Sequence, residues 1–115
     1  MPRQLPTVST LNDAVRYVID SNRADGYVPS RFMQITANGD LPNLLEVCKR
    51  LINKGELLET LEKDFAKYPA MVTIEDFVAR RGSEWGFDSM TVQNAQARSV
   101  YFDQLVGQQR YVSTN

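Results

Sequence analysis

The sequence predicts an all-α fold, a single compact bundle of about five to six short helices. Apolar residues recur at intervals of three and four in six segments, and most of these segments are separated by residues that cap or break helices. Strand patterns are few and short. The chain has 115 residues, 43% of them hydrophobic and 23% charged, which is typical of one globular domain.

The first three predicted helices have clear beginnings and ends. They cover residues 9–22, 30–37 and 40–55. Ser9 or Thr10 can cap the first helix, and the Asp25-Gly26 turn ends it. Asn38-Gly39 supplies a left-handed exit from the second helix, and Asp40 can cap the third, which has Pro42 in its first turn. The third helix carries a wide apolar stripe of Leu44, Leu45, Val47, Cys48, Leu51 and Ile52.

The last three predicted helices cover residues 56–68, 73–81 and 88–106. Pro69 ends the first of these, because a residue that precedes proline disfavours helical backbone. Thr73 and Asp76 form a capping-box-like start to the second, and Gly107 stops the third. One side of the last helix carries Val92, Ala95, Ser99, Phe102, Leu105 and Val106. Phe102 should therefore be buried, and Tyr101 should point outward on the side of Arg98 and Asn94.

These patterns predict one helical domain over residues 9–107. Residues 1–8 are expected to be an N-terminal extension, and residues 108–115 a polar C-terminal tail whose removal should hardly change stability. Two segments resemble strands, Tyr68–Ile74 and Arg110–Val112, but they are short and no hairpin turn pairs them. We expect the first to be a linker and the second to belong to the tail.

Charge and cysteine content indicate a cytoplasmic protein. There are 13 basic and 14 acidic residues, so no net field favours nucleic acid or an anionic membrane. Cys48 is the only cysteine, and the first ten residues lack the apolar core of a signal peptide. The apolar runs are too short to cross a bilayer.

The residues available for catalysis indicate that the chain is not an enzyme. It has no histidine, which removes the commonest general base and the commonest neutral metal ligand. Cys48 lies in an apolar stripe, where we expect a small buried hydrophobic residue. The acidic group Glu56, Glu59, Glu62 and Asp64 is interpreted as a solvated helix face. We expect no catalytic residue, no metal site and no cofactor.

The leading functional hypothesis is a small helical module that binds another protein as an adaptor, regulator or accessory subunit. The candidate binding residues are Arg80, Arg81, Trp85, Arg98 and Tyr101. Arginines beside an exposed indole are typical of binding hot spots. If Trp85 packs in the core instead, the neighbouring arginines are ordinary surface side chains that extend over it to reach water. Both arrangements of Trp85 stay open here, and a homodimer is one form that the partner can take.

The alternative hypothesis is a DNA-binding regulator with a helix-turn-helix or winged-helix-like unit. Residues 31–52 contain a short helix, a turn and a longer helix, and LINKGELLE is similar to the end of a recognition helix that enters a wing. The candidate DNA-binding residues are Arg31, Asn43, Lys49 and Arg50. Residues 40–80 hold eight acids and six bases, which is opposite to the usual basic footprint.

A family resemblance covers residues 44–88. Here GELLETLEK is followed by TIEDFVARR and then by WGFD, and this order resembles the small helical domain of nitrogen-fixation-associated leader peptides. In that family a leucine-rich helix precedes a helix with a phenylalanine and a glycine-aromatic turn, and the domain docks onto modifying enzymes. The resemblance implies that the positions matching the family's structural residues are Leu57, Leu61, Phe77, Val78, Gly86 and Phe87.

Overall fold

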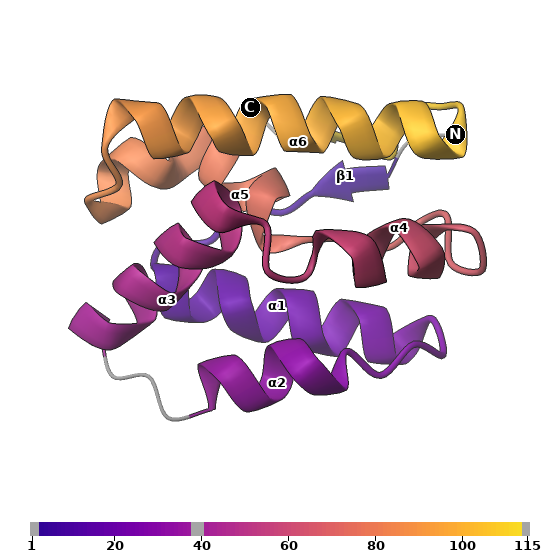
Figure 1. Ribbon diagram of the computed structural model, residues 1–115, viewed down its shortest axis with the longest axis horizontal. Coiled ribbons are helices and arrows are strands. Elements are labelled where there is room, and N and C mark those ends of the chain that lie inside the picture. The colour runs from indigo at the N-terminus through magenta and orange to yellow at the C-terminus, as the bar shows by residue number, and fades with distance from the viewer. Residues whose placement is uncertain (1–2, 38–40, 114–115) are drawn as a thin grey trace.

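The computed structural model describes residues 3–37 and 41–113, and it is mostly α-helical, as predicted (Figure 1). The helices are α1 (Leu11–Ala24), α2 (Ser30–Thr36), α3 (Leu41–Lys54), α4 (Leu58–Phe65), α5 (Ile74–Arg81), the short 3-10 helix η1 (Gly82–Trp85) and α6 (Ser89–Val106). Two three-residue strands, β1 (Arg3–Leu5) and β2 (Tyr111–Ser113), lie close to the chain ends.

Several helix ends lie where the sequence predicts them. Thr10 caps α1, and its side chain accepts a hydrogen bond of 3.1 Å from the Asp13 N–H. Thr73 and Asp76 form a capping box at the start of α5. Gly107 ends α6 in the left-handed region, with a φ of 76°. The expected Asn38-Gly39 exit and the Asp40 cap lie outside the described residues.

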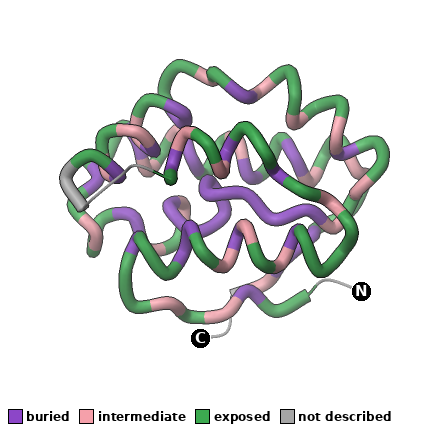
Figure 2. The backbone as a smooth tube through the Cα atoms, turned by 90° about the horizontal axis from the view of Figure 1, so that it is seen from below, coloured by how far each residue is buried: buried purple, intermediate pink, exposed green. Residues whose placement is uncertain are grey.

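The core is built around α5 and the segment that leads into it. Residues 71–78 are all buried, and they form the long unbroken buried stretch in the middle of Figure 2. Helix α6 packs along α5, and Gly82 permits this close approach. A Cβ atom at Gly82 would lie 2.7 Å from a methyl group of Val78 and 3.0 Å from one of Val92. A glycine is therefore required where the end of α5 meets α6.

The expectation of an undocked C-terminal tail is wrong. Strand β2 pairs in parallel with β1, with Arg3 opposite Tyr111 and Leu5 opposite Ser113. Leu5, Arg110 and Tyr111 are only 2%, 4% and 3% exposed. A three-residue parallel pair joins distant parts of a chain without a hairpin, so no local turn signal announces it. Residues from both predicted terminal segments therefore belong to the core.

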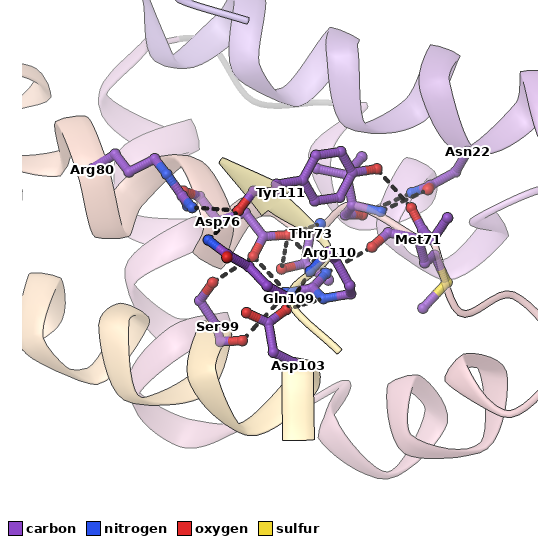
Figure 3. Close-up of polar contacts among 12 residues, drawn as sticks. Asn22, Met71, Thr73, Asp76, Arg80, Ser99, Asp103, Gln109, Arg110 and Tyr111 are labelled. Atoms are coloured by element: carbon purple, nitrogen blue, oxygen red, sulfur yellow. Dashed lines mark hydrogen bonds and ion pairs between the residues drawn. The ribbon is translucent and has the colours of Figure 1, made fainter. Parts of the chain in front are cut away.

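The Arg110 guanidinium is held in a buried polar cluster between α5 and α6 (Figure 3). It donates to the two Asp76 carboxylate oxygens at 2.7 and 3.0 Å, to the Met71 carbonyl at 2.7 Å and to Asp103 at 2.7 Å. Ser99 also donates to Asp76, at 2.6 Å. A single arginine thus joins the C-terminal segment to both helices.

The segment before α5 is buried although it forms no strand. Asn22 of α1 holds it, because its side-chain amide donates to the Val72 carbonyl at 2.9 Å and its oxygen accepts from the Val72 N–H at 3.0 Å. This side chain replaces the pairing that a neighbouring strand would give. The predicted absence of a strand over Tyr68–Ile74 is correct, but residues 71–74 are part of the core.

Candidate functional site

Three of the predicted binding residues lie around the end of α5 and η1, and each has an intramolecular partner. Arg80 donates to the Asp76 carbonyl at 2.7 Å, and Arg81 pairs with Glu84 at 2.7 Å. Trp85 is half-buried against the core, and its indole N–H donates to the Ser9 carbonyl at 3.1 Å. Of the two arrangements that the sequence left open, the structure has a partly packed indole that fastens the segment before α1.

The other two predicted residues lie on α6: Arg98 is turned toward α3 and α5, and the exposed Tyr101 lies at the edge of the helix that faces α4. Asn94 donates to Asn53 at 2.8 Å, Arg98 donates to the Leu51 carbonyl at 3.4 Å, and the Tyr101 hydroxyl donates to Glu62 at 2.7 Å. This confirms that Tyr101 follows Asn94 and Arg98 along one side. Phe102 is fully buried and Tyr101 is 36% exposed, so the predicted register of the helix is correct.

The candidate DNA-binding residues lie on α2 and α3. Arg31 and Asn43 are exposed. Lys49 lies 3.6 Å from the Asp88 carboxylate, and Arg50 lies 3.0 Å from that of Glu56. Two of the three cations proposed for phosphate contacts therefore have an acidic neighbour. This arrangement supplies no basic strip along α3.

The outer face of α6 differs from the exposed faces of the other helices, because it carries no charge. Helix α6 is described along its whole length, and its exposed residues are Ser89, Met90, Gln93, Gln96, Ala97, Val100, Tyr101, Gln104 and Leu105. We call this set the outer face. Both charged residues of α6 are turned toward the rest of the protein, where Arg98 pairs with Glu75 and Asp103 with Arg110.

The exposed faces of α1, α3 and α4 are charged, as is usual for helices in contact with water. Their exposed charged residues are Asp13, Arg16, Asp20 and Arg23 on α1, Glu46, Arg50 and Lys54 on α3, and Glu59, Glu62 and Lys63 on α4. Figure 1 shows α6 along one edge of the molecule with the other helices on one side of it. Its free side is therefore uncharged over the full length of the helix.

A regular stripe runs along the middle of the outer face. Met90, Gln93, Ala97, Val100 and Gln104 follow one another at intervals of three, four, three and four residues. At about 100° per residue, the stripe lies roughly opposite the core-facing residues Thr91, Ala95, Ser99 and Phe102. Sequence reasoning found Tyr101 but missed this stripe, although the absence of charge at those spacings was visible in the sequence. Leu105, which the sequence placed on the core side, is 42% exposed and belongs to the outer face.

An apolar cavity of about 50 Å³ lies among α1, α2, α4 and the segment before α5. Val18, Phe32, Leu57 and Leu61 contribute to its walls, together with Glu75 and Arg98. One Arg98 nitrogen lies 3.4 Å from the buried Glu75 carboxylate. Burial raises the pKa of Glu75, and the neighbouring Arg98 only partly opposes this effect. The cavity is much smaller than the several hundred cubic ångströms of typical small-molecule sites.

Cys48 and the carboxylates show no arrangement for chemistry in the described part of the chain. The Cys48 thiol is completely buried, as its place in the apolar stripe predicts, and burial raises its pKa to about 12. Within residues 3–37 and 41–113, no three metal-ligating side chains come together in a group that could hold a metal ion. No helix in these ranges is both long enough and apolar enough to cross a membrane.

Comparison with known proteins found no matching family model, no matching curated protein and no matching solved structure. The resemblance of residues 44–88 to nitrogen-fixation-associated leader peptides therefore stays a prediction. In the structure, Leu57, Phe77, Val78 and Phe87 are buried, and Gly86 has a left-handed φ of 94°. These are structural roles that any helical domain can use.

Proposed function

We propose that this chain is a non-enzymatic helical module that binds another protein, and that the outer face of α6 is its binding surface. The observation that carries the proposal is the absence of charge from the whole exposed side of an 18-residue helix, although α1, α3 and α4 all expose charged residues. We further propose a cytoplasmic location, in keeping with a single, buried cysteine.

The physical basis is the cost of removing charges from water. A charged side chain that enters an interface loses its hydration, and protein interfaces are accordingly depleted of charge at their centres. Tyrosine and methionine are enriched there, and Tyr101 and Met90 occupy the outer face. Val100 and Met90 are 56% and 66% exposed, which is large for apolar side chains that face only solvent. The outer face can thus be covered without breaking an ion pair.

The remaining candidates have less support. Arg81 and Trp85 are engaged within the chain, so a partner would have to compete for groups already bonded to Glu84 and Ser9. The DNA-binding hypothesis rests on Arg31, Asn43, Lys49 and Arg50, and acids accompany the last two. Neither the Arg81 and Trp85 surface nor the candidate DNA-binding surface differs from the rest of the exposed surface as clearly as the outer face does.

Site-directed photo-crosslinking in native cells tests the proposal. A photoreactive residue would replace Val100, and in a matched control it would replace Lys63 on the charged face of α4, where the side chain is 78% exposed. We expect specific adducts with another protein chain, whether a different protein or a second copy of this one, from position 100 and none of these from position 63. Equal adduct patterns from the two positions, or no adducts from position 100, would show that the outer face of α6 is not a binding surface.

A further inference from the structure

We propose that the partner covering the outer face of α6 is a second copy of this chain, in an antiparallel two-fold pair of α6 helices. This inference rests on the proposed function, because it names the occupant of the same surface. It is drawn from the charge distribution, the spacing of the exposed residues and the hydrogen-bonding groups that they carry.

Charge is the first reason for choosing a second copy. In a two-fold interface the same surface patch meets itself, so every charge on the patch loses its hydration in both copies and needs an opposite charge of the same patch as its partner. The faces of α1, α3 and α4 would each bring charged residues into such an interface, whereas the outer face of α6 brings none. The formal net charge of the chain is only −1, so two whole copies also repel one another weakly.

Spacing is the second reason. The stripe Met90, Gln93, Ala97, Val100 and Gln104 has the three-and-four alternation of the a and d positions of a coiled coil. This spacing keeps one seam of a helix in contact with another helix that packs at a shallow angle. In an antiparallel pair centred between Ala97 and Val100, each Ala97 faces the Val100 of the other copy. Each Gln93 then faces the other copy's Gln104.

The chemistry of the stripe is self-complementary in this arrangement. A glutamine amide both donates and accepts hydrogen bonds, so Gln93 and Gln104 can satisfy one another across the pair. The small Ala97 leaves room for the larger Val100, which lets the helix axes approach. The antiparallel direction also sets the positive end of each helix dipole beside the negative end of the other.

The size of the surface sets the expected strength. The 18 residues of α6 span about 27 Å. A single pair of helices of this length covers less than the roughly 800 Å² per partner of a standard stable interface. The polar glutamines in the stripe reduce the apolar contact further. We therefore expect a reversible dimer with a dissociation constant in the micromolar range.

Analytical ultracentrifugation of the purified chain tests the inference. Between about 1 and 500 µM the chain should pass from monomer to dimer. Val100→Glu should raise the dissociation constant at least about tenfold, because it brings a charge into the centre of the seam. Val28→Glu is the matched control, since Val28 is 55% exposed and Val100 is 56% exposed, and it should change the constant less than about twofold.

A second variant with the opposite charge separates lost association from lost folding. Circular dichroism of each variant monitors its folding. Ala97→Lys should weaken the dimer as Val100→Glu does, and mixing the two variants should restore association, because position 97 of one copy faces position 100 of the other. A chain that stays monomeric throughout, or a dimer that Val100→Glu and Val28→Glu affect equally, would overturn the inference.

Disulfide trapping tests the antiparallel direction. Gln93→Cys and Gln104→Cys should form a mixed disulfide when combined, whereas Gln93→Cys alone should not crosslink, because the two copies of position 93 are separated by about 16 Å along the helices. The buried Cys48 should not compete. Efficient crosslinking of Gln93→Cys alone would overturn the antiparallel pair. The proposed function is tested separately: a monomeric chain whose position 100 still crosslinks to another protein in cells would lose only the second-copy partner.

Discussion

Two adjacent carboxylates on α5, Asp76 and Glu75, are equally buried but very differently bonded. Asp76 receives two hydrogen bonds from Arg110, at 2.7 and 3.0 Å, and others from Ser99 and the Thr73 N–H. Glu75 is held by its own backbone N–H and by one long contact of 3.4 Å with Arg98. Both side chains are less than 5% exposed. Burial alone therefore does not show how strongly an acid is held.

The two arginines differ in the same way. The Arg110 guanidinium lies 5.0 Å from the ring centre of Phe65 and 5.7 Å from that of Phe102, and its side chain is 1% exposed. Arg98 is 16% exposed and donates to the Leu51 carbonyl only at 3.4 Å. A buried ion pair offsets the loss of hydration only when its geometry is good and its remaining groups are bonded. Asp76 and Arg110 meet that condition, whereas Glu75 and Arg98 meet it only in part.

Removing residues 110–115 should cause the largest loss of stability. This deletion takes away Arg110 and Tyr111, dissolves the β1–β2 pair and leaves Asp76 buried without its arginine. We expect the free energy of unfolding to fall by at least about 5 kcal/mol, which is enough to unfold many domains of this size. Thermal unfolding followed by circular dichroism would measure the loss. The substitution Gln108→Ala, at an exposed position nearby, is the control and should change little.

Arg110→Met should cost somewhat less, about 3 to 5 kcal/mol. It keeps the strand pair and much of the side-chain volume but leaves the Asp76 carboxylate with an unmatched charge. Chemical denaturation would give the difference in unfolding free energy. A loss below about 1 kcal/mol would mean that Asp76 easily forms other hydrogen bonds. Asp76 would then not be held more firmly than Glu75 by its arginine.

Arg98→Met is the same substitution at the loosely bonded pair, and it should cost less than about 2 kcal/mol. The Glu75 carboxyl loses only one long contact, and burial already raises its pKa, so it can take up a proton when the arginine is removed. The ratio of the two Arg→Met effects tests the comparison directly. Equal losses would show that distance and bond number do not distinguish these pairs.

The sequence predicts the helices far better than it predicts these pairs. Periodicity and local caps, such as Thr10 before α1 and the Thr73–Asp76 box before α5, depend on residues close in the chain. The same Asp76 has a second role with Arg110, 34 residues away, and nothing in the polar stretch around Arg110 indicates burial. A long-range pair of this kind is decided by packing, which periodicity does not contain.

The geometry of the proposed binding surface was predictable to a similar extent. Periodicity correctly predicted that Phe102 is buried and Tyr101 is exposed, because the two side chains point about 100° apart around one helix. Arg98 was included in the same candidate surface, but it turns toward Glu75. The inward turn of Arg98 has a physical cause: an arginine at the edge of a helix face can reach inward when a buried carboxylate lies on a neighbouring helix, and the sequence does not show which helices are neighbours.

Glu75→Gln should change the free energy of unfolding least among these four changes. Unlike the others, it should stabilise the protein at neutral pH. Because burial raises the folded-state pKa of Glu75, the folded state prefers the protonated form, with Arg98 as the opposing charge and Asp76 as a like one. The stability that Glu75 contributes is thus fully present below its unfolded pKa and is lost as pH rises through the folded pKa.

Glutamine resembles the protonated form at every pH. We expect the variant to exceed the native chain by on the order of 1 kcal/mol at pH 8, and the gap to close toward pH 4. Parallel chemical denaturation of both proteins across this range would measure the gap, since the other carboxylates titrate in both. A native chain more stable than the variant at pH 8 would show that ionised Glu75 is held by Arg98 as firmly as Asp76 is held by Arg110.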